Sequence, residues 1–172
     1  MRIIGRKILA LLALLALLVG CGGNYYQLTA EQKILAARLK AISGEYLVRK
    51  IAHASFGGNV FCAFKVLDIE ERGDQVNEYL YAVCQEYSLR DGRLKEGEGL
   101  AMPVALSFRK EAGTYRVVEH RTAGDGSRYA SDIKRIFPAR THAEIFSPET
   151  GALLLKEAKQ EALASSQVKD TR

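Results

Sequence analysis

The sequence has 172 residues, 48% of them hydrophobic and 26% charged, with a formal net charge of +5. Three basic residues lie among the first seven, so the 152 residues after residue 20 carry 22 basic and 20 acidic side chains. That length is typical of one domain, and the near balance of charge argues against a nucleic-acid-binding protein, which needs a strongly basic face.

Residues 1–20 have the pattern of a secretory signal peptide. Arg2, Arg6 and Lys7 precede an aliphatic run over residues 8–19, which contains only Ile, Leu, Ala and Val. A positively charged start followed by a short apolar run directs export. Because a membrane-spanning helix needs roughly 20 apolar residues, we predict a removable leader rather than a transmembrane helix.

Cys21 directly follows this leader. Residues 18–21, LVGC, resemble the bacterial lipobox, in which the cysteine thiol receives a diacylglycerol and the leader is cut before the cysteine. The resemblance implies an extracytoplasmic lipoprotein, acylated for example with palmitate and anchored to a bacterial membrane. The anchor would lie on the periplasmic face of the outer membrane, or on the outer face of a single membrane. There are two alternatives. One is an ordinary signal peptide with an incidental cysteine, and the other is a short buried helix.

The mature chain divides into three parts. We expect a short lipidated tether over residues 21–28, one globular domain over residues 29–165 and a flexible tail over residues 166–172. Within the tether, Tyr25 and Tyr26 fit either contact with lipid headgroups or packing against the domain.

The domain is expected to begin with a helix over residues 28–44. Thr29 and Gln32 have the spacing of a capping box, in which each side chain bonds the backbone N–H of the other. Residues 45–56 fit a second short helix better than a strand.

From residue 60 the composition changes to β-branched and aromatic residues. We predict strands over residues 60–70, 76–89, 103–111 and 114–122, paired as an antiparallel meander. Pro103 is expected at the start of its strand, where a missing N–H costs least. The glycine-rich, charged residues 90–99 are expected to form a loop.

The remaining chain returns to helix, over residues 131–137, 141–146 and 148–166. The predicted fold class is therefore α+β, with an N-terminal helix packed on a roughly four-stranded antiparallel sheet and C-terminal helices behind it. A cystatin-like layout, or the curved-sheet cone of the nuclear transport factor superfamily, fits this order by analogy. We expect one face of the sheet to remain in contact with water.

Cys62 and Cys84 lie on the first two predicted strands. A three-residue hairpin loop at residues 72–74 places them opposite each other, whereas a two-residue loop at Gly73 and Asp74 places them on opposite faces. Export permits a disulfide. The bond therefore depends on one residue of register, and we favour two buried free cysteines.

We expect no metal and no cofactor. His53, His120 and His142 are scattered, and the chain has no Cys-x-x-Cys and no helical histidine pair. It also has no nucleophile elbow, phosphate loop or calcium loop, so no residue is assigned a catalytic role.

The segment over residues 120–138 is the candidate for a recognition loop. Small residues are followed there by several hydrogen-bonding side chains, namely Asp125, Ser127, Arg128, Tyr129 and Asp132. The interpretation that we favour is a junction between a strand and the next helix. Residues 60–146 are also similar to segments of uncharacterised bacterial lipoproteins, which implies an envelope setting but no activity.

These observations favour a lipid-anchored, non-enzymatic binding or accessory module of the cell envelope, with an envelope protein as its partner. One alternative is an envelope hydrolase or transferase with a site between sheet and helices, and another is an extracytoplasmic sensor. A deep pocket with convergent Asp, His or Cys side chains would favour the enzyme. A filled core under a broad exposed patch would favour binding.

Overall fold

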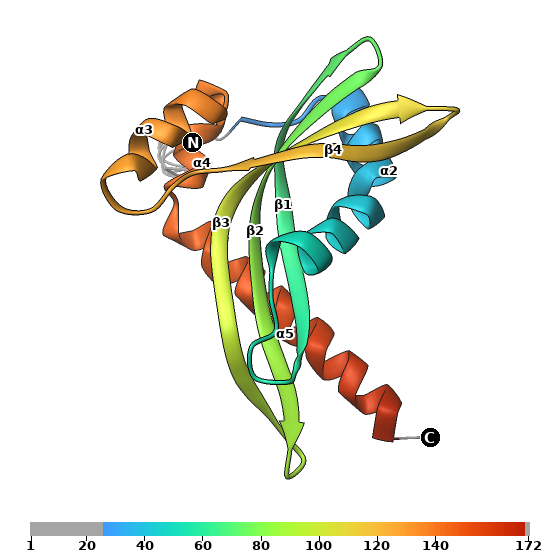
Figure 1. The fold of residues 1–172 in the computed structure, drawn as a ribbon, viewed down its shortest axis with the longest axis vertical. Helices are drawn as coiled ribbons and strands as arrows, with labels where there is room; N and C mark the ends of the chain where they lie inside the picture. Colours follow the sequence, from blue (N-terminus) through green and yellow to red (C-terminus); the bar gives the residue numbers. More distant parts are fainter. Residues whose placement is uncertain (1–25, 171–172) are drawn as a thin grey trace, which may run out of the picture.

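A computed structural model describes residues 26–170, which form an open sheet flanked by helices (Figure 1). The elements in chain order are α2 (Ala30–Tyr46), η2 (Leu47–Ile51), β1 (Asn59–Arg72), β2 (Gln75–Arg90), β3 (Arg93–Glu111), β4 (Thr114–Thr122), η3 (Gly126–Arg128), α3 (Tyr129–Ile136), η4 (Ala139–Thr141), α4 (His142–Ile145) and α5 (Pro148–Asp170). This order confirms the predicted α+β class, with an N-terminal helix, four strands and C-terminal helices. Cys21 and the predicted leader lie outside the described residues.

The first helix begins at the predicted capping box. The Thr29 hydroxyl accepts the N–H of Gln32 at 3.2 Å, and the Gln32 side-chain oxygen accepts the N–H of Thr29 at 2.9 Å. The helix continues past Tyr46 as the π-helical turn η2, so the predicted second helix forms as an extension of the first. Within the described part of the chain, no helix combines the length and the apolar character that crossing a membrane requires.

The four strands form an antiparallel sheet in the order β1-β2-β3-β4, which is the predicted meander. β2 and β3 are longer than predicted, because Arg90 pairs with Arg93 across a two-residue turn. Asp91 and Gly92 in that turn have φ angles of 51° and 68°, which match the twist of a tight hairpin. The predicted loop over residues 90–99 was therefore wrong, and most of it belongs to β3.

Pro103 lies inside β3, opposite Tyr81 of β2, and not at the start of its strand. The pairing of β4 with β3 ends at Val104, so the far side of β3 faces no strand at Pro103. A strand tolerates proline at such an edge position, because the missing N–H has no ladder partner to lose.

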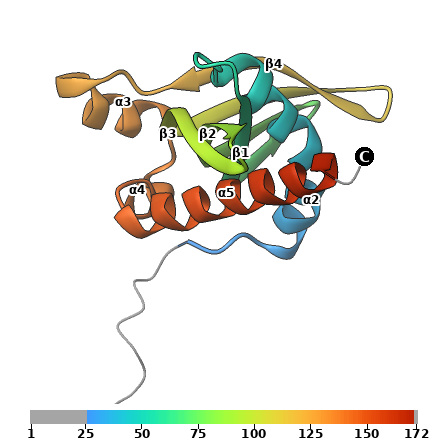
Figure 2. The same ribbon diagram turned by 90° about the horizontal axis from the view of Figure 1, so that it is seen from below.

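Both faces of the sheet are covered by helices, and Figure 2 shows α5 running along the sheet. On one face, Leu80 of β2 packs in a buried cluster with Leu39 of α2 and Leu47 of η2. On the other face, Val83 packs with Leu154 and Ala158 of α5. The expectation of one wet face was wrong, because the long helix α5 returns across the sheet and the short helices α3 and α4 cover its remaining end.

Candidate binding groove

The candidate recognition loop over residues 120–138 contains a structural junction at Asp132. Asp132 accepts the backbone N–H of Gly124 at 2.9 Å and pairs with Arg135 at 2.8 Å. The hydrogen bond from Arg135, followed by that from Gly124, holds the pKa of Asp132 below its usual value. Asp132 thus joins the end of β4 to α3, which agrees with the interpretation that we favoured.

Of the other four residues of that segment, Arg128 lies close enough to Asp132 for its charge to help lower the pKa of that carboxyl. Asp125, Ser127 and Arg128 are exposed. Tyr129 is half-buried and its ring meets the edge of Phe146, with the ring centres 6.1 Å apart. None of these five residues lines the two hollows along β1.

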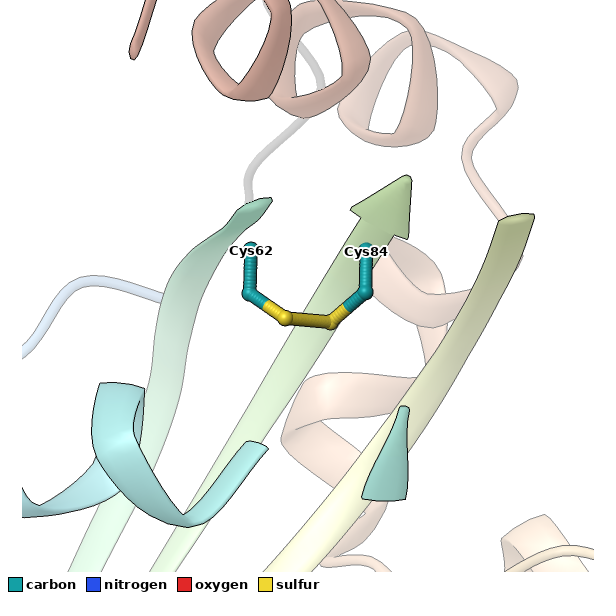
Figure 3. Close-up of a disulfide and its surroundings, with 2 residues drawn as sticks. All are labelled: Cys62 and Cys84. Carbon is teal, nitrogen blue, oxygen red and sulfur yellow. A yellow bond between two sulfur atoms is a disulfide. The ribbon is translucent and has the colours of Figure 1, made fainter. Parts of the chain in front are cut away.

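Cys62 and Cys84 are joined by a disulfide between β1 and β2 (Figure 3). The hairpin has the two-residue turn, since Arg72 pairs with Gln75, and that turn alone would put the cysteines out of register. A β-bulge between Val66 and Asp68 shifts the ladder by one residue and brings Cys62 opposite Cys84. Our preference for free cysteines is thereby corrected, because it did not include the bulge.

Glu78 of β2 is fully buried on the side of the sheet that α2 covers. Its Oε2 accepts the hydroxyl of Ser43 at 2.5 Å, and its Oε1 has no hydrogen-bond partner in the described part of the chain. Burial raises the pKa of Glu78 to about 7, against the opposing hydrogen bond from Ser43. Because solvent does not reach it, we assign this shift to packing rather than to a reactive site.

Glu86, further along β2, is also buried but lies among hydrogen-bond donors. Its carboxylate accepts the backbone N–H groups of Ser55 at 2.9 Å, Phe56 at 3.0 Å and Gly58 at 2.6 Å. Burial alone would raise the pKa of Glu86, but these bonds together hold it below its usual value. Glu86 therefore fixes the connection between η2 and β1.

A third buried carboxylate ties the start of the domain to its C-terminal part. Asp68 of β1 pairs with Arg140 of η4 at 2.5 Å and accepts a bond from the Gln32 amide at 3.0 Å. Burial raises the pKa of Asp68, while Arg140 opposes the rise. The guanidinium of Arg140 also lies 5.2 Å from the ring centre of Tyr26, whose hydroxyl bonds Gln32. Tyr26 thus packs on the domain, which is one of its two predicted roles.

The three histidines do not converge. His120 Nδ1 lies 2.8 Å from the Tyr46 hydroxyl, and His142 Nε2 lies 2.9 Å from the Phe137 carbonyl oxygen. In residues 26–170, no group of three or more His, Cys, Asp or Glu side chains is arranged to hold a metal ion.

A hollow beneath η2 brings His53 near Cys84 and Glu98. This set resembles the components of a thiol site, but Cys84 is bonded to Cys62 and Glu98 accepts the hydroxyl of Ser55. A bonded cysteine supplies no thiolate, so this hollow has no activated nucleophile in the oxidised protein.

A further surface feature follows the free edge of β1, and we call it the β1 groove. β1 is an outermost strand of the sheet. Two neighbouring hollows of about 320 and 330 Å³ lie along it, the first over Val60, Phe61 and Cys62 and the second over Phe64 and Lys65.

The walls of the β1 groove come from helices that lie far apart in the sequence. Val48 of η2 stands on one side, and its side chain is 38% exposed. Leu153 of α5 stands on the other side and is 63% exposed. The groove therefore combines a strand edge with exposed apolar side chains, which is a composition typical of a binding surface.

The charges in the β1 groove are mainly acidic. Two basic side chains line it, and both are paired, Arg49 with Glu45 at 3.2 Å and Lys65 with Glu144 at 2.7 Å. Three further carboxylates line the α5 side and take part in no ion pair among the described residues, namely Glu149, Glu157 and Glu161. The groove thus has three uncompensated negative charges.

The sequence analysis missed both the buried carboxylates and the β1 groove. A local signal existed for Glu78 and Glu86, since each interrupts an apolar strand. No local signal existed for the groove, because β1 and α5 come together only in the folded chain.

Comparisons with models of protein families, with curated proteins and with solved structures give no match for this chain.

Proposed function

We propose that this chain is a lipid-anchored binding module of the bacterial cell envelope and that the β1 groove is its binding surface. The observation that carries the proposal is the groove itself, two neighbouring open hollows with exposed apolar and acidic side chains above a filled core. The anchor is supported by the lipobox resemblance at residues 18–21.

The enzyme alternative has weaker support. Convergent Asp, His or Cys side chains in a deep pocket would favour it. One hollow of the described residues, at His53, gathers such side chains, but its cysteine is bonded. Glu78, which has the raised pKa, is sealed in the core.

The anchor is tested by mass spectrometry of the mature protein from its native host. We expect an N-terminal Cys21 that carries a diacylglycerol and an added acyl chain, and a Cys21→Ala variant that leaves the membrane fraction. An unmodified thiol at Cys21, or unchanged membrane attachment of the variant, would contradict the anchor.

The binding surface is tested by site-specific photo-crosslinking in the native envelope. We expect a photoreactive amino acid at Leu153, in the β1 groove, to give a discrete adduct. The same amino acid at Val118, an exposed position on β4, is the matched control. Equal labelling from both positions, or no adduct from Leu153, would contradict the proposal.

A further inference from the structure

We propose that the β1 groove receives an extended, lysine- or arginine-rich peptide segment, which adds to the free edge of β1 as a fifth strand. This inference deepens the proposed function, since it rests on the groove as the binding surface. It does not depend on the lipid anchor.

The backbone of β1 presents hydrogen-bonding groups to the groove. Cys62 and Cys84 are directly opposite, with their Cα atoms 4.0 Å apart, which is the close spacing of a non-hydrogen-bonded antiparallel pair. The N–H and C=O of Cys62 therefore point away from β2. Since this pattern alternates along a strand, the same groups of Val60 and Phe64 also point outward.

No other strand takes up these groups. The sheet ends at β1, and in residues 26–170 no backbone hydrogen bond outside the helices and strands involves Val60, Cys62 or Phe64. Three outward N–H groups and three outward C=O groups are the template that an added strand needs.

This part of β1 is held rigidly. The disulfide bonds Cys62 to β2, and Ala63 packs beneath α5 with Val83 and Leu154. A rigid edge loses little conformational freedom when a peptide binds, which favours affinity.

The accessible edge is short. Lys65 is exposed just beyond Phe64, and the β-bulge follows between Val66 and Asp68. Lysines and bulges are common devices that stop further pairing at a sheet edge. The structure thus protects one end of β1 and leaves residues 60–64 available to a segment of about five to seven residues.

Charge selects the occupant. Glu157 and Glu161 lie one helical turn apart and Glu149 lies on the same side of α5, so a cationic segment would relieve their mutual repulsion. A second copy of this chain fits less well. Edge-to-edge pairing of two β1 strands would bring the acidic sides of both α5 helices together.

The side chains of an added strand would alternate between the two walls. Positions directed toward α5 meet Leu153, Glu157 and Glu161, which suit lysine with its aliphatic stem and cationic end. Positions directed toward η2 meet Val48, which suits an aliphatic residue. The expected ligand is therefore a segment in which basic and aliphatic residues alternate.

The test uses the isotope-labelled full chain in detergent micelles and the peptide acetyl-Lys-Val-Lys-Val-Lys-Val-Lys-amide. We expect saturable binding in an NMR titration, and slower amide exchange at Val60, Cys62 and Phe64 by about tenfold or more. A Glu-Val peptide of the same length should not bind. Binding of both peptides, protection at β4 instead of β1, or no binding at millimolar peptide would overturn the proposal.

Two variants test the recognition. Glu157→Lys combined with Glu161→Lys should weaken binding of the Lys-Val peptide by about tenfold. The control, Glu119→Lys combined with Asp125→Lys, makes the same change in net charge at exposed positions outside the groove and should leave the affinity unchanged. Equal effects of the two pairs would show a non-specific attraction and overturn the proposal.

The third variant is Val60→Pro, which removes one outward N–H, and we expect a two- to tenfold weaker affinity. Val60→Ala keeps that N–H and is its control, and intact disulfide formation reports folding of both. Equal affinity of Val60→Pro and Val60→Ala would contradict strand addition.

The outcomes separate this inference from the function proposed above. A crosslinked partner at Leu153 without binding of the Lys-Val peptide would keep the binding module and overturn the cationic strand. Protection of the amides of Val60, Cys62 and Phe64 that rises with protein concentration in the absence of peptide would identify a second copy of this chain as the occupant. That result would also overturn the proposed cationic strand.

Discussion

Glu78 and Glu86 are both buried on β2, yet their pKa values move in opposite directions. The difference lies in the number of donors that each carboxylate meets. Glu86 receives backbone N–H groups from two segments, the connection after η2 and β3. Glu78 receives one hydroxyl, from Ser43. Donors that replace water keep a buried carboxylate ionised, and their absence favours the protonated form.

Glu78 makes the stability of the domain depend on pH. Its pKa is about 7 in the folded protein and 4.5 as the reference value for an unfolded chain, so the folded state binds the proton more tightly. The free energy of unfolding is therefore highest below pH 4.5, where Glu78 is protonated in both states. It falls as the pH rises from 4.5 to about 7, by about 3 kcal/mol in total. Glu78→Gln should remove this loss, because an amide does not titrate.

The measurement is the free energy of unfolding in urea at several pH values between 4.5 and 8. Glu119→Gln, at an exposed position, is the control and should follow the wild type. The assignment to Glu78 is wrong if the wild type and Glu78→Gln change by the same amount over this range.

At the scale of elements, the register of the β1–β2 hairpin shows how far the sequence could be interpreted. Capping residues, hairpin turns and β-branched runs act locally, so α2 and the four strands could be predicted. The bulge beside Leu67 could not be predicted, because it depends on contacts from both faces of the sheet. Leu67 packs with the cluster under α3 and α4, whereas Ile69 packs with the cluster under α2. The disulfide follows from that bulge.

The disulfide should contribute substantially to stability. It closes a loop with a sequence separation of 22 residues, which corresponds to about 3 kcal/mol of lost entropy in the unfolded chain. We expect Cys62→Ser combined with Cys84→Ser to lower the free energy of unfolding in urea by that amount. A reductant should lower it similarly in the wild type and leave the double variant unchanged. Identical unfolding of the wild type with and without reductant would contradict the bond.

At the scale of the whole molecule, three buried clusters share one sheet, and β2 contributes to all of them. Such an arrangement favours a single unfolding transition, because no cluster can lose its packing without exposing the strand that the others use. The chain before α2 is part of this unit, since Tyr26 contacts Arg140 and Gln32.

A chain that begins at residue 26 should therefore unfold in one transition. With no tryptophan and eight tyrosines in the sequence, tyrosine fluorescence and far-ultraviolet circular dichroism are suitable probes, and we expect the same midpoint from both. A chain that begins at residue 30 lacks the cap residue Thr29 and the ring of Tyr26, and should be less stable by about 1–2 kcal/mol. Separate midpoints, or equal stability of the two chains, would contradict this view.

The contact of Tyr26 with Arg140 also limits how far the folded domain can lie from Cys21. Only five peptide units separate Cys21 from Tyr26 in the sequence, and a fully extended chain spans about 3.5 Å per residue, or roughly 18 Å in all. If Cys21 holds the lipid, the domain remains within a thin layer of solvent directly above the bilayer. Any partner has to enter that layer. Closeness to the membrane would therefore limit which molecules reach the domain, before their chemical fit to the groove decides which of them bind.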